Sequence, residues 1–172
     1  MSVGTDTFER LQRLQTRFGP RVFGKIVQKL LALALYAAGF EYVVERGVQG
    51  VDIDAAMPDG RKYAIEVKTT GGEGVSLSED NIEALKDRSK DGYCPLVAVL
   101  RMQMFEAWLF AAIPLRRLRP GPLPVGTLRA YRLYELEAAI GPAFEIVITQ
   151  HCRGVLSGGE HYLSDVLGHR RG

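Results

Sequence analysis

The spacing of apolar residues changes along the chain, and these changes predict the order of its elements. Over residues 5–18 and again over 22–38, apolar positions recur at helical spacing, and a Gly-Pro pair at 19–20 separates the two helices. The second helix is apolar over a wide arc, which favours packing against a sheet. Residues 40–45 then predict a first strand.

A β-hairpin is predicted directly after this first strand. Two short, β-rich runs at 51–56 and 61–68 flank the turn sequence Pro58-Asp59-Gly60. Proline presets one backbone angle, aspartate bonds its own backbone and glycine accepts a positive φ, so this tripeptide favours a tight turn. We therefore expect two antiparallel strands, with one apolar face of each directed to a core.

The hairpin carries charged residues at a spacing that suggests chemistry. Side chains two apart in a strand share a face, so Asp52 lies with Asp54, and Glu66 lies with Lys68. Carboxylates that converge from adjacent strands can hold a hard divalent cation through oxygen. A nearby lysine can orient a water or stabilise charge on a phosphate. The alternative is an ordinary solvated polar face of an amphipathic hairpin.

Further elements are predicted after the hairpin. Residues 69–74 form a glycine-rich loop, either a mobile gate or a plain connection. Ser78 is a good N-cap for a helix that runs to about residue 89. Continuous apolar runs at 95–100 and 105–113 predict two buried strands joined by a turn at 101–104.

The C-terminal third has weaker signals. Residues 115–132 carry five arginines, no acid and three prolines that forbid a continuous helix. Residues 133–140 favour a short helix and 144–149 a last strand. His151, His161 and His169 match no metal motif, so we expect a solvated or loosely ordered tail.

Composition bounds the class of protein. A chain of 172 residues is long enough for one domain with a real core, and we expect a basic N-terminal helix at 1–21, a core at 22–118 and a C-terminal extension at 119–172. Two cysteines make neither a disulfide framework nor a zinc site. No apolar run is long enough to cross a bilayer, and a cytoplasmic location is expected.

The net charge of +2 says little about partners, but the basic residues are unevenly distributed. They gather on the N-terminal helices and in the acid-free segment near residue 116, and such clusters suit a polyanion as well as plain solvation. If the polyanion is a nucleic acid, the residues predicted to contact its phosphates are Arg10, Arg13, Arg17, Lys25, Arg116, Arg117 and Arg119.

The order helix, strand, hairpin, helix, strand, strand, together with Gly50-Val51-Asp52-Ile53 and Ala64-Ile65-Glu66-Val67-Lys68, resembles the PD-(D/E)xK nuclease superfamily. Within it the chain is most similar to the archaeal-type Holliday-junction resolvases. The resemblance covers about residues 23–118. It implies an α/β fold, a restriction-endonuclease-like α/β/α core with a central mixed sheet of about five strands.

The resemblance also implies roles for individual residues. Asp52 and Glu66 would bind Mg²⁺, with Mn²⁺ as a substitute, and the backbone carbonyl of Val67 would be a further ligand. Lys68 would assist the attacking water. Gln28 stands where many members place a first-helix Glu or Gln. Asp54 is an extra acid that competes with Asp52 for the role of primary metal ligand.

These expectations describe a metal-dependent DNA endonuclease, structure-specific for branched DNA and acting as a homodimer. Three alternatives remain open from the sequence. The substrate could be duplex DNA at a short site, the fold could be an inactive nucleic-acid-binding module, or the hairpin could be merely solvated.

Overall fold

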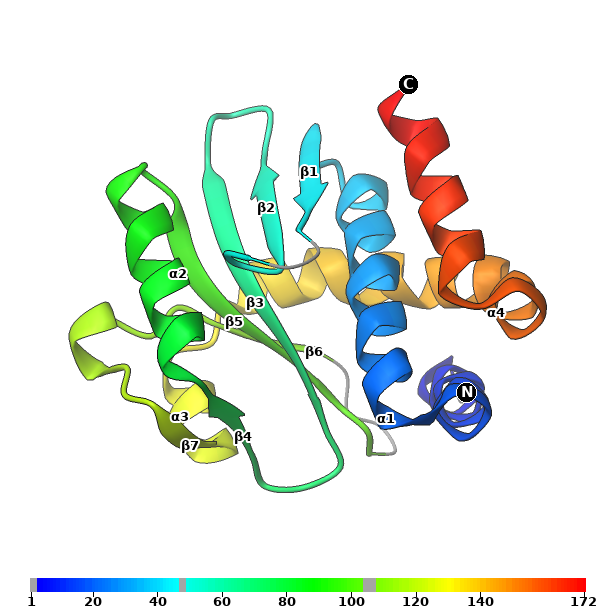
Figure 1. The fold of residues 1–172 in the computed structure, drawn as a ribbon, viewed down its shortest axis with the longest axis horizontal. Coiled ribbons are helices and arrows are strands. Elements are labelled where there is room, and N and C mark those ends of the chain that lie inside the picture. Colours follow the sequence, from blue (N-terminus) through cyan, green and yellow to red (C-terminus); the bar gives the residue numbers. More distant parts are fainter. Residues whose placement is uncertain (1–2, 47–48, 104–107) are drawn as a thin grey trace.

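The protein is described from a computed structural model that covers residues 3–46, 49–103 and 108–172. Its centre is a mixed five-stranded sheet in the order β1-β2-β3-β5-β6 (Figure 1). The strand bounds are β1 Tyr42–Glu45, β2 Ile53–Ala56, β3 Lys62–Thr70, β5 Cys94–Arg101 and β6 Trp108–Ala111. The predicted α/β class and number of strands are confirmed.

The predicted hairpin is formed by β2 and β3. The two strands are antiparallel, with Ile53 opposite Ile65. At the tip the Gly60 amide donates to the Met57 carbonyl at 3.0 Å, and Gly60 has the positive φ of 90° that the turn requires. β3 then pairs in parallel with β5, and β5 pairs antiparallel with β6.

Two long helices cover one face of the sheet. Helix α1 spans Val3–Ala37 and α4 spans Tyr134–Arg171, and the two pack along each other (Figure 1). Gly19, with a φ of 81°, divides α1 at the predicted break. The apolar side chains of the second half of α1 are buried between the sheet and α4, while polar positions such as Arg21 and Lys25 are exposed.

A second, smaller layer covers the other face. Its elements pack on a separate apolar cluster that includes Leu85, Val97 and Leu128. Helix α2 begins after the predicted N-cap, Ser78. The bounds in this layer are β4 Gly74–Leu77, α2 Glu79–Lys90, the 3₁₀ helix η1 Leu115–Arg117, β7 Gly121–Pro124 and α3 Val125–Ala130. β4 and β7 form a two-stranded antiparallel sheet of their own.

Of the C-terminal predictions, the helix at 133–140 is present as the start of α4, but the last strand and the loosely ordered tail are wrong. Residues 144–149 belong to helix α4, because Ile140, Phe144, Val147 and Ile148 continue one buried helical stripe despite their local β propensity. The tail is also ordered: after a kink at Gly159 it continues as helix and packs on α1 through buried apolar residues.

The kink in α4 is held by specific contacts. The Tyr162 ring lies directly against Gly154, where a Cβ would come within 2.3 Å of the ring. The Tyr162 hydroxyl also forms a 2.9 Å hydrogen bond with Nδ1 of His151, so this histidine is not a solvated tail residue. His161 lies 3.8 Å from Asp165 and His169 contacts the Asp165 carbonyl.

One smaller expectation also changes. The glycine-rich loop is shorter than predicted, because β3 continues through Thr70 and β4 begins at Gly74. Trp108 of edge strand β6 is buried, and the Leu133 amide donates to the Phe110 carbonyl along that strand at 2.8 Å. The predicted strand start at 105 and the turn residue at 104 lie outside the described residues.

Within the described ranges, no helix combines the length and apolar character needed to cross a membrane.

Candidate active site

The predicted acidic residues lie where the hairpin meets the layer of α2. Asp52 comes just before β2, and Glu66 and Lys68 lie on β3. Neither of the two hairpin carboxylates at 54 and 66 is solvated: Asp54 is 0% and Glu66 3% exposed. A merely solvated polar face is therefore excluded, and each buried carboxylate needs a compensating partner.

Asp52 is fixed by the backbone of the neighbouring strand. The regular pairing of β2 with β3 ends at Ile53 and Ile65. Beyond that point the Val67 amide donates to Oδ2 of Asp52 at 2.7 Å. The carboxylate thus takes the place of a missing strand carbonyl, which brings it to β3 beside Glu66.

The charge of Glu66 is only partly balanced by its surroundings. Its Oε1 lies 3.4 Å from Nζ of Lys68, but its buried Oε2 has no hydrogen-bond partner among the described residues. Burial and then the charge of Asp52 raise the pKa of Glu66 to about 7, against the opposing effect of Lys68. Burial also raises the pKa of Asp52, against the Val67 amide and Lys68.

This donor set fits a hard cation. Two neighbouring carboxylates face one ammonium group, and an orphaned carboxylate oxygen remains. The N–H and C=O of one strand residue point to the same edge, so the Val67 carbonyl is directed to the Asp52 side as well. Within residues 3–46, 49–103 and 108–172, no group of three or more acidic, histidine or cysteine side chains gathers at one point.

Lys68 has a second partner that the sequence did not reveal. Its Nζ donates to Oδ1 of Asn81 at 3.1 Å. Asn81 also forms a reciprocal capping box with Ser78 at the start of α2. The spacing Ser-x-x-Asn is the one sequence signal for this residue, and it points only to the cap.

Asp54 has different surroundings from Asp52. Its Oδ2 accepts from Nη2 of Arg46 at 2.7 Å and from Nη2 of Arg88 at 2.9 Å. The Nε atoms of both arginines also donate to its carboxylate, each at 3.0 Å. Arg88 lies in turn over the Tyr93 ring, 4.0 Å from its centroid. These contacts favour Asp52, not Asp54, as the carboxylate open to a metal.

Gln28 reaches this region from α1, but it contacts backbone. Its Nε2 donates to the carbonyls of Arg46 and Asp52, both at 3.3 Å. The Asp52 carbonyl also accepts from the Arg46 amide at 2.9 Å. Gln28 thus holds together the two ends of the connection between β1 and β2.

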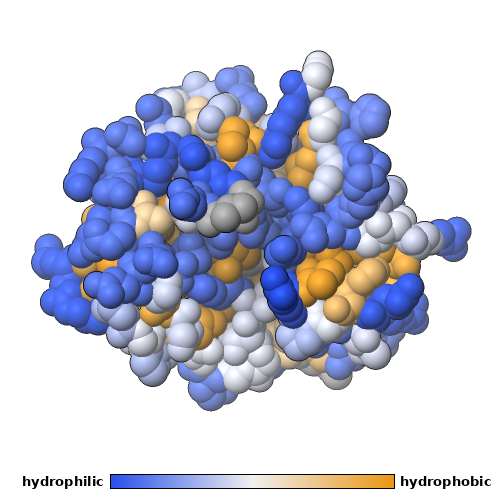
Figure 2. Space-filling model, viewed as in Figure 1, coloured by the Kyte–Doolittle hydropathy of each residue, from blue (hydrophilic) through white to orange (hydrophobic). Residues whose placement is uncertain are grey.

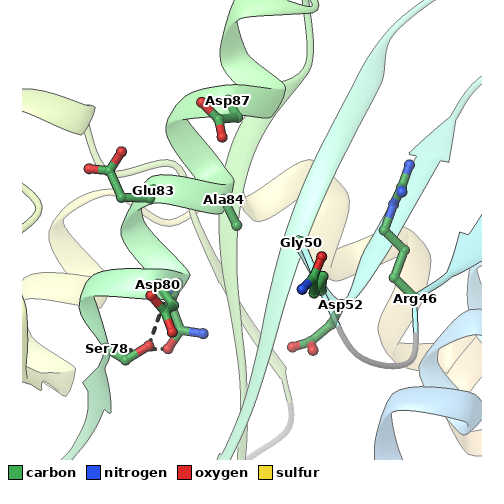
Figure 3. A pocket seen from close by; sticks show the side chains of 10 residues that line it. Arg46, Gly50, Asp52, Ser78, Asp80, Glu83, Ala84 and Asp87 are labelled. Atoms are coloured by element: carbon green, nitrogen blue, oxygen red, sulfur yellow. Dashed lines mark hydrogen bonds between the residues drawn. The ribbon is translucent and has the colours of Figure 1, made fainter.

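A cleft of about 580 Å³ opens beside Asp52. Asp52 and Arg46 lie on one side and α2 on the other (Figure 3). Asp80, Glu83 and Asp87 of α2 make that wall acidic. The surface over α2 is mostly hydrophilic in the space-filling view (Figure 2). A phosphate backbone that lies along α2 would therefore meet like charge.

The predicted DNA-contacting residues are not brought into one group. Those on α1 belong to the helical layer in which α1 packs against α4. Arg116 and Arg117 lie in η1, in the layer of α2, on the opposite face of the sheet. Arg119 donates to the carbonyls of Arg116 and Leu118, at 2.9 and 2.8 Å.

The mixed sheet with its helical layers is a restriction-endonuclease-like α/β fold, and its hairpin carries the Asp–Glu-x-Lys pattern that resembles the PD-(D/E)xK nucleases. No protein-family model matches the chain, and no curated protein matches it. Among solved structures it is similar to Hjc, a Holliday junction resolvase from the archaeal hyperthermophile Archaeoglobus fulgidus. The TM-score is 0.54 at 25% identity, over 67% of this chain and 94% of that chain. The predicted resemblance is confirmed.

Proposed function

We propose that the protein is a divalent-metal-dependent endonuclease that hydrolyses phosphodiester bonds in branched DNA. The observation that carries this proposal is the under-neutralised pair of half-buried Asp52 and buried Glu66 beside Lys68. Perturbed carboxyl pKa values next to a cleft are typical of functional sites. The similarity to the resolvase Hjc supports DNA junctions as the substrate class.

The cation would be held by the carboxylates of Asp52 and Glu66 and the carbonyl of Val67. When bound, Mg²⁺ or Mn²⁺ supplies Lewis-acid polarisation of the scissile phosphate and lowers the pKa of the attacking water. Lys68 has the reach and charge to orient that water or to stabilise the phosphate as charge develops on it. The Val67 amide keeps Asp52 in place throughout.

DNA binding is proposed to use two separate basic groups. The first is on α1 and the second in the segment that includes η1, and both would contribute affinity through phosphates, not base recognition. Because they lie on opposite layers, one protein chain would present them to different DNA arms. A two-fold homodimer would place two active sites on the two strands of a junction, and we propose that state.

The direct experiment compares cleavage of a four-way DNA junction with cleavage of a linear duplex of the same sequence. We expect Mg²⁺- or Mn²⁺-dependent cleavage of the junction, and loss of cleavage with excess chelator. Preferential cut sites in the linear duplex would indicate a restriction-type enzyme. Junction binding with no cleavage under any divalent metal would contradict the proposed activity and leave a binding module.

A further inference from the structure

We propose that Asn81 is a positioning residue that holds Lys68 in its working orientation. The inference rests on the proposed function, because it assigns the support of the proposed catalytic lysine. It connects the capping box of α2 to the reacting end of β3. Asn81 also lines the cleft beside Asp52, so the contact lies at the site itself.

The hydrogen bonds determine how the Asn81 amide is oriented. Its Oδ1 accepts from the Ser78 amide at 2.9 Å and from Nζ of Lys68 at 3.1 Å. Both partners can only donate, so the carbonyl end of the side chain must face them. The amide NH₂ group is therefore at the other end, and it has no hydrogen-bond partner in the described part of the chain.

Lys68 needs such support because its side chain is long and partly exposed. Four methylene carbons leave many rotamers open, and 27% of the side chain is accessible to solvent. Its other protein partner, Glu66, is farther away at 3.4 Å and is the proposed metal ligand. The Asn81 carbonyl is neutral and is not a proposed metal ligand. Its hydrogen bond to the ammonium group therefore does not depend on metal binding.

Asn81 is itself rigidly held. Its backbone amide donates to Oγ of Ser78 at 3.1 Å, which completes the capping box. The first turns of α2 are anchored by the buried side chains of Ile82 and Leu85. An acceptor fixed at a packed helix start can orient a flexible lysine with little loss of entropy on each turnover.

The competing interpretation is that Asn81 only caps α2. A cap explains the contacts between Asn81 and Ser78, but it does not require the hydrogen bond to Lys68. The two interpretations separate in three variants. Asn81→Ala removes the cap partner and the lysine acceptor, Ser78→Ala weakens the cap alone, and Asn81→Asp keeps an acceptor for both Ser78 and Lys68.

The first readout follows the lysine directly and does not depend on nuclease activity. In ¹³C-labelled-lysine NMR spectra, the two Hε protons of an ordered side chain have different shifts, and those of a freely rotating one coincide. We expect separate Hε shifts for Lys68 in the unmodified protein, in Ser78→Ala and in Asn81→Asp. In Asn81→Ala they should coincide.

The second readout is the rate of junction cleavage. Asn81→Ala should lower kcat about ten- to hundredfold more than Ser78→Ala does, with KM nearly unchanged. Equal effects of Asn81→Ala and Ser78→Ala on the NMR signal and on kcat would overturn the proposal and leave a helix cap. If the unmodified protein cleaves no DNA, the nuclease proposal fails, while the lysine spectra still decide the positioning role.

Discussion

Two groups of carboxylates on the same hairpin, Asp54 in one and Asp52 with Glu66 in the other, differ in how their charge is balanced. Asp54 faces two guanidinium groups, and both of its oxygens accept hydrogen bonds. Asp52 and Glu66 share a single ammonium group, and one Glu66 oxygen is left without a partner. Only one residue, Ile53, lies between Asp52 and Asp54 in the chain.

This difference separates a structural charge from a functional one. A buried carboxylate with matched cations connects β2 to α2 and gains nothing from a further positive charge. A buried carboxylate pair with excess negative charge is stabilised by a cation from outside. Metal binding is thus expected to depend on the Asp52–Glu66 pair. The Asp54 group is expected to contribute to the stability of the fold and not to metal binding.

The largest expected effect is the loss of cleavage when Glu66 or its neighbour Lys68 is changed. Glu66→Gln and Lys68→Ala should each lower the rate of junction cleavage by about 10³-fold or more, since each removes a group proposed to act in the transition state. Steady-state cleavage assays measure this. The exposed positions Glu135→Gln and Lys90→Ala are matched controls. Unchanged cleavage in Glu66→Gln would break the proposed division.

Changing Asp54, whose charge is balanced by two arginines, should instead destabilise the fold. Asp54→Asn leaves Arg46 and Arg88 without their buried counter-charge, which should lower the free energy of unfolding by about 3–5 kcal/mol. Urea unfolding monitored by circular dichroism measures this loss. Asp52→Asn is the comparison, because its carboxylate has no guanidinium partner among the described contacts. An equal loss in both variants would show that the two groups are not different in kind.

The pH dependence of stability should sharpen the same contrast. Because the pKa of Glu66 is raised to about 7, the folded state retains a proton that the unfolded chain releases near its ordinary pKa of 4.5. Stability from this group should therefore be full below about pH 4.5 and fall as pH rises to about 7. The fall is on the order of 3 kcal/mol, and the raised pKa already includes the opposing effect of Lys68.

Glu66→Gln should remove this fall and make the metal-free protein more stable at pH 8. Mg²⁺ should restore stability to the unmodified protein at pH 8 and have little effect on the Gln variant. Thermal unfolding at pH 5 and pH 8, with and without Mg²⁺, provides the measurement. A metal-free protein equally stable at both pH values would contradict the raised pKa.

Local sequence patterns predicted the hairpin and α2 because each carries its own signal, whereas the five-stranded mixed sheet was expected from the family resemblance. The Pro-Asp-Gly turn and the Ser78 cap act over a few residues, so they can be recognised from the local sequence alone. Residues 144–149 were misassigned because a short β-branched run outweighed a helical stripe that continues over many turns. The packing of α4 on α1 decides that segment, and a local pattern does not contain it.

The support of the site was not predictable in the same way. Arg88 reaches Asp54 across 34 residues, and Asn81 reaches Lys68 across 13. No spacing rule connects such pairs, since the distance is closed by the sheet and the placement of α2. The charged residues of the candidate site could be named from the sequence, but the partner of each carboxylate could not.

The burial of α1 has a consequence for how the chain can be divided. From Phe23 to Leu35 nearly every apolar side chain of this helix is buried, between the sheet on one side and α4 on the other. The C-terminal helix α4 therefore shares one apolar core with α1 and the sheet. A shortened chain without α4 would expose apolar side chains of α1, the helix that carries Gln28. Expression and engineering of the protein should therefore keep α4.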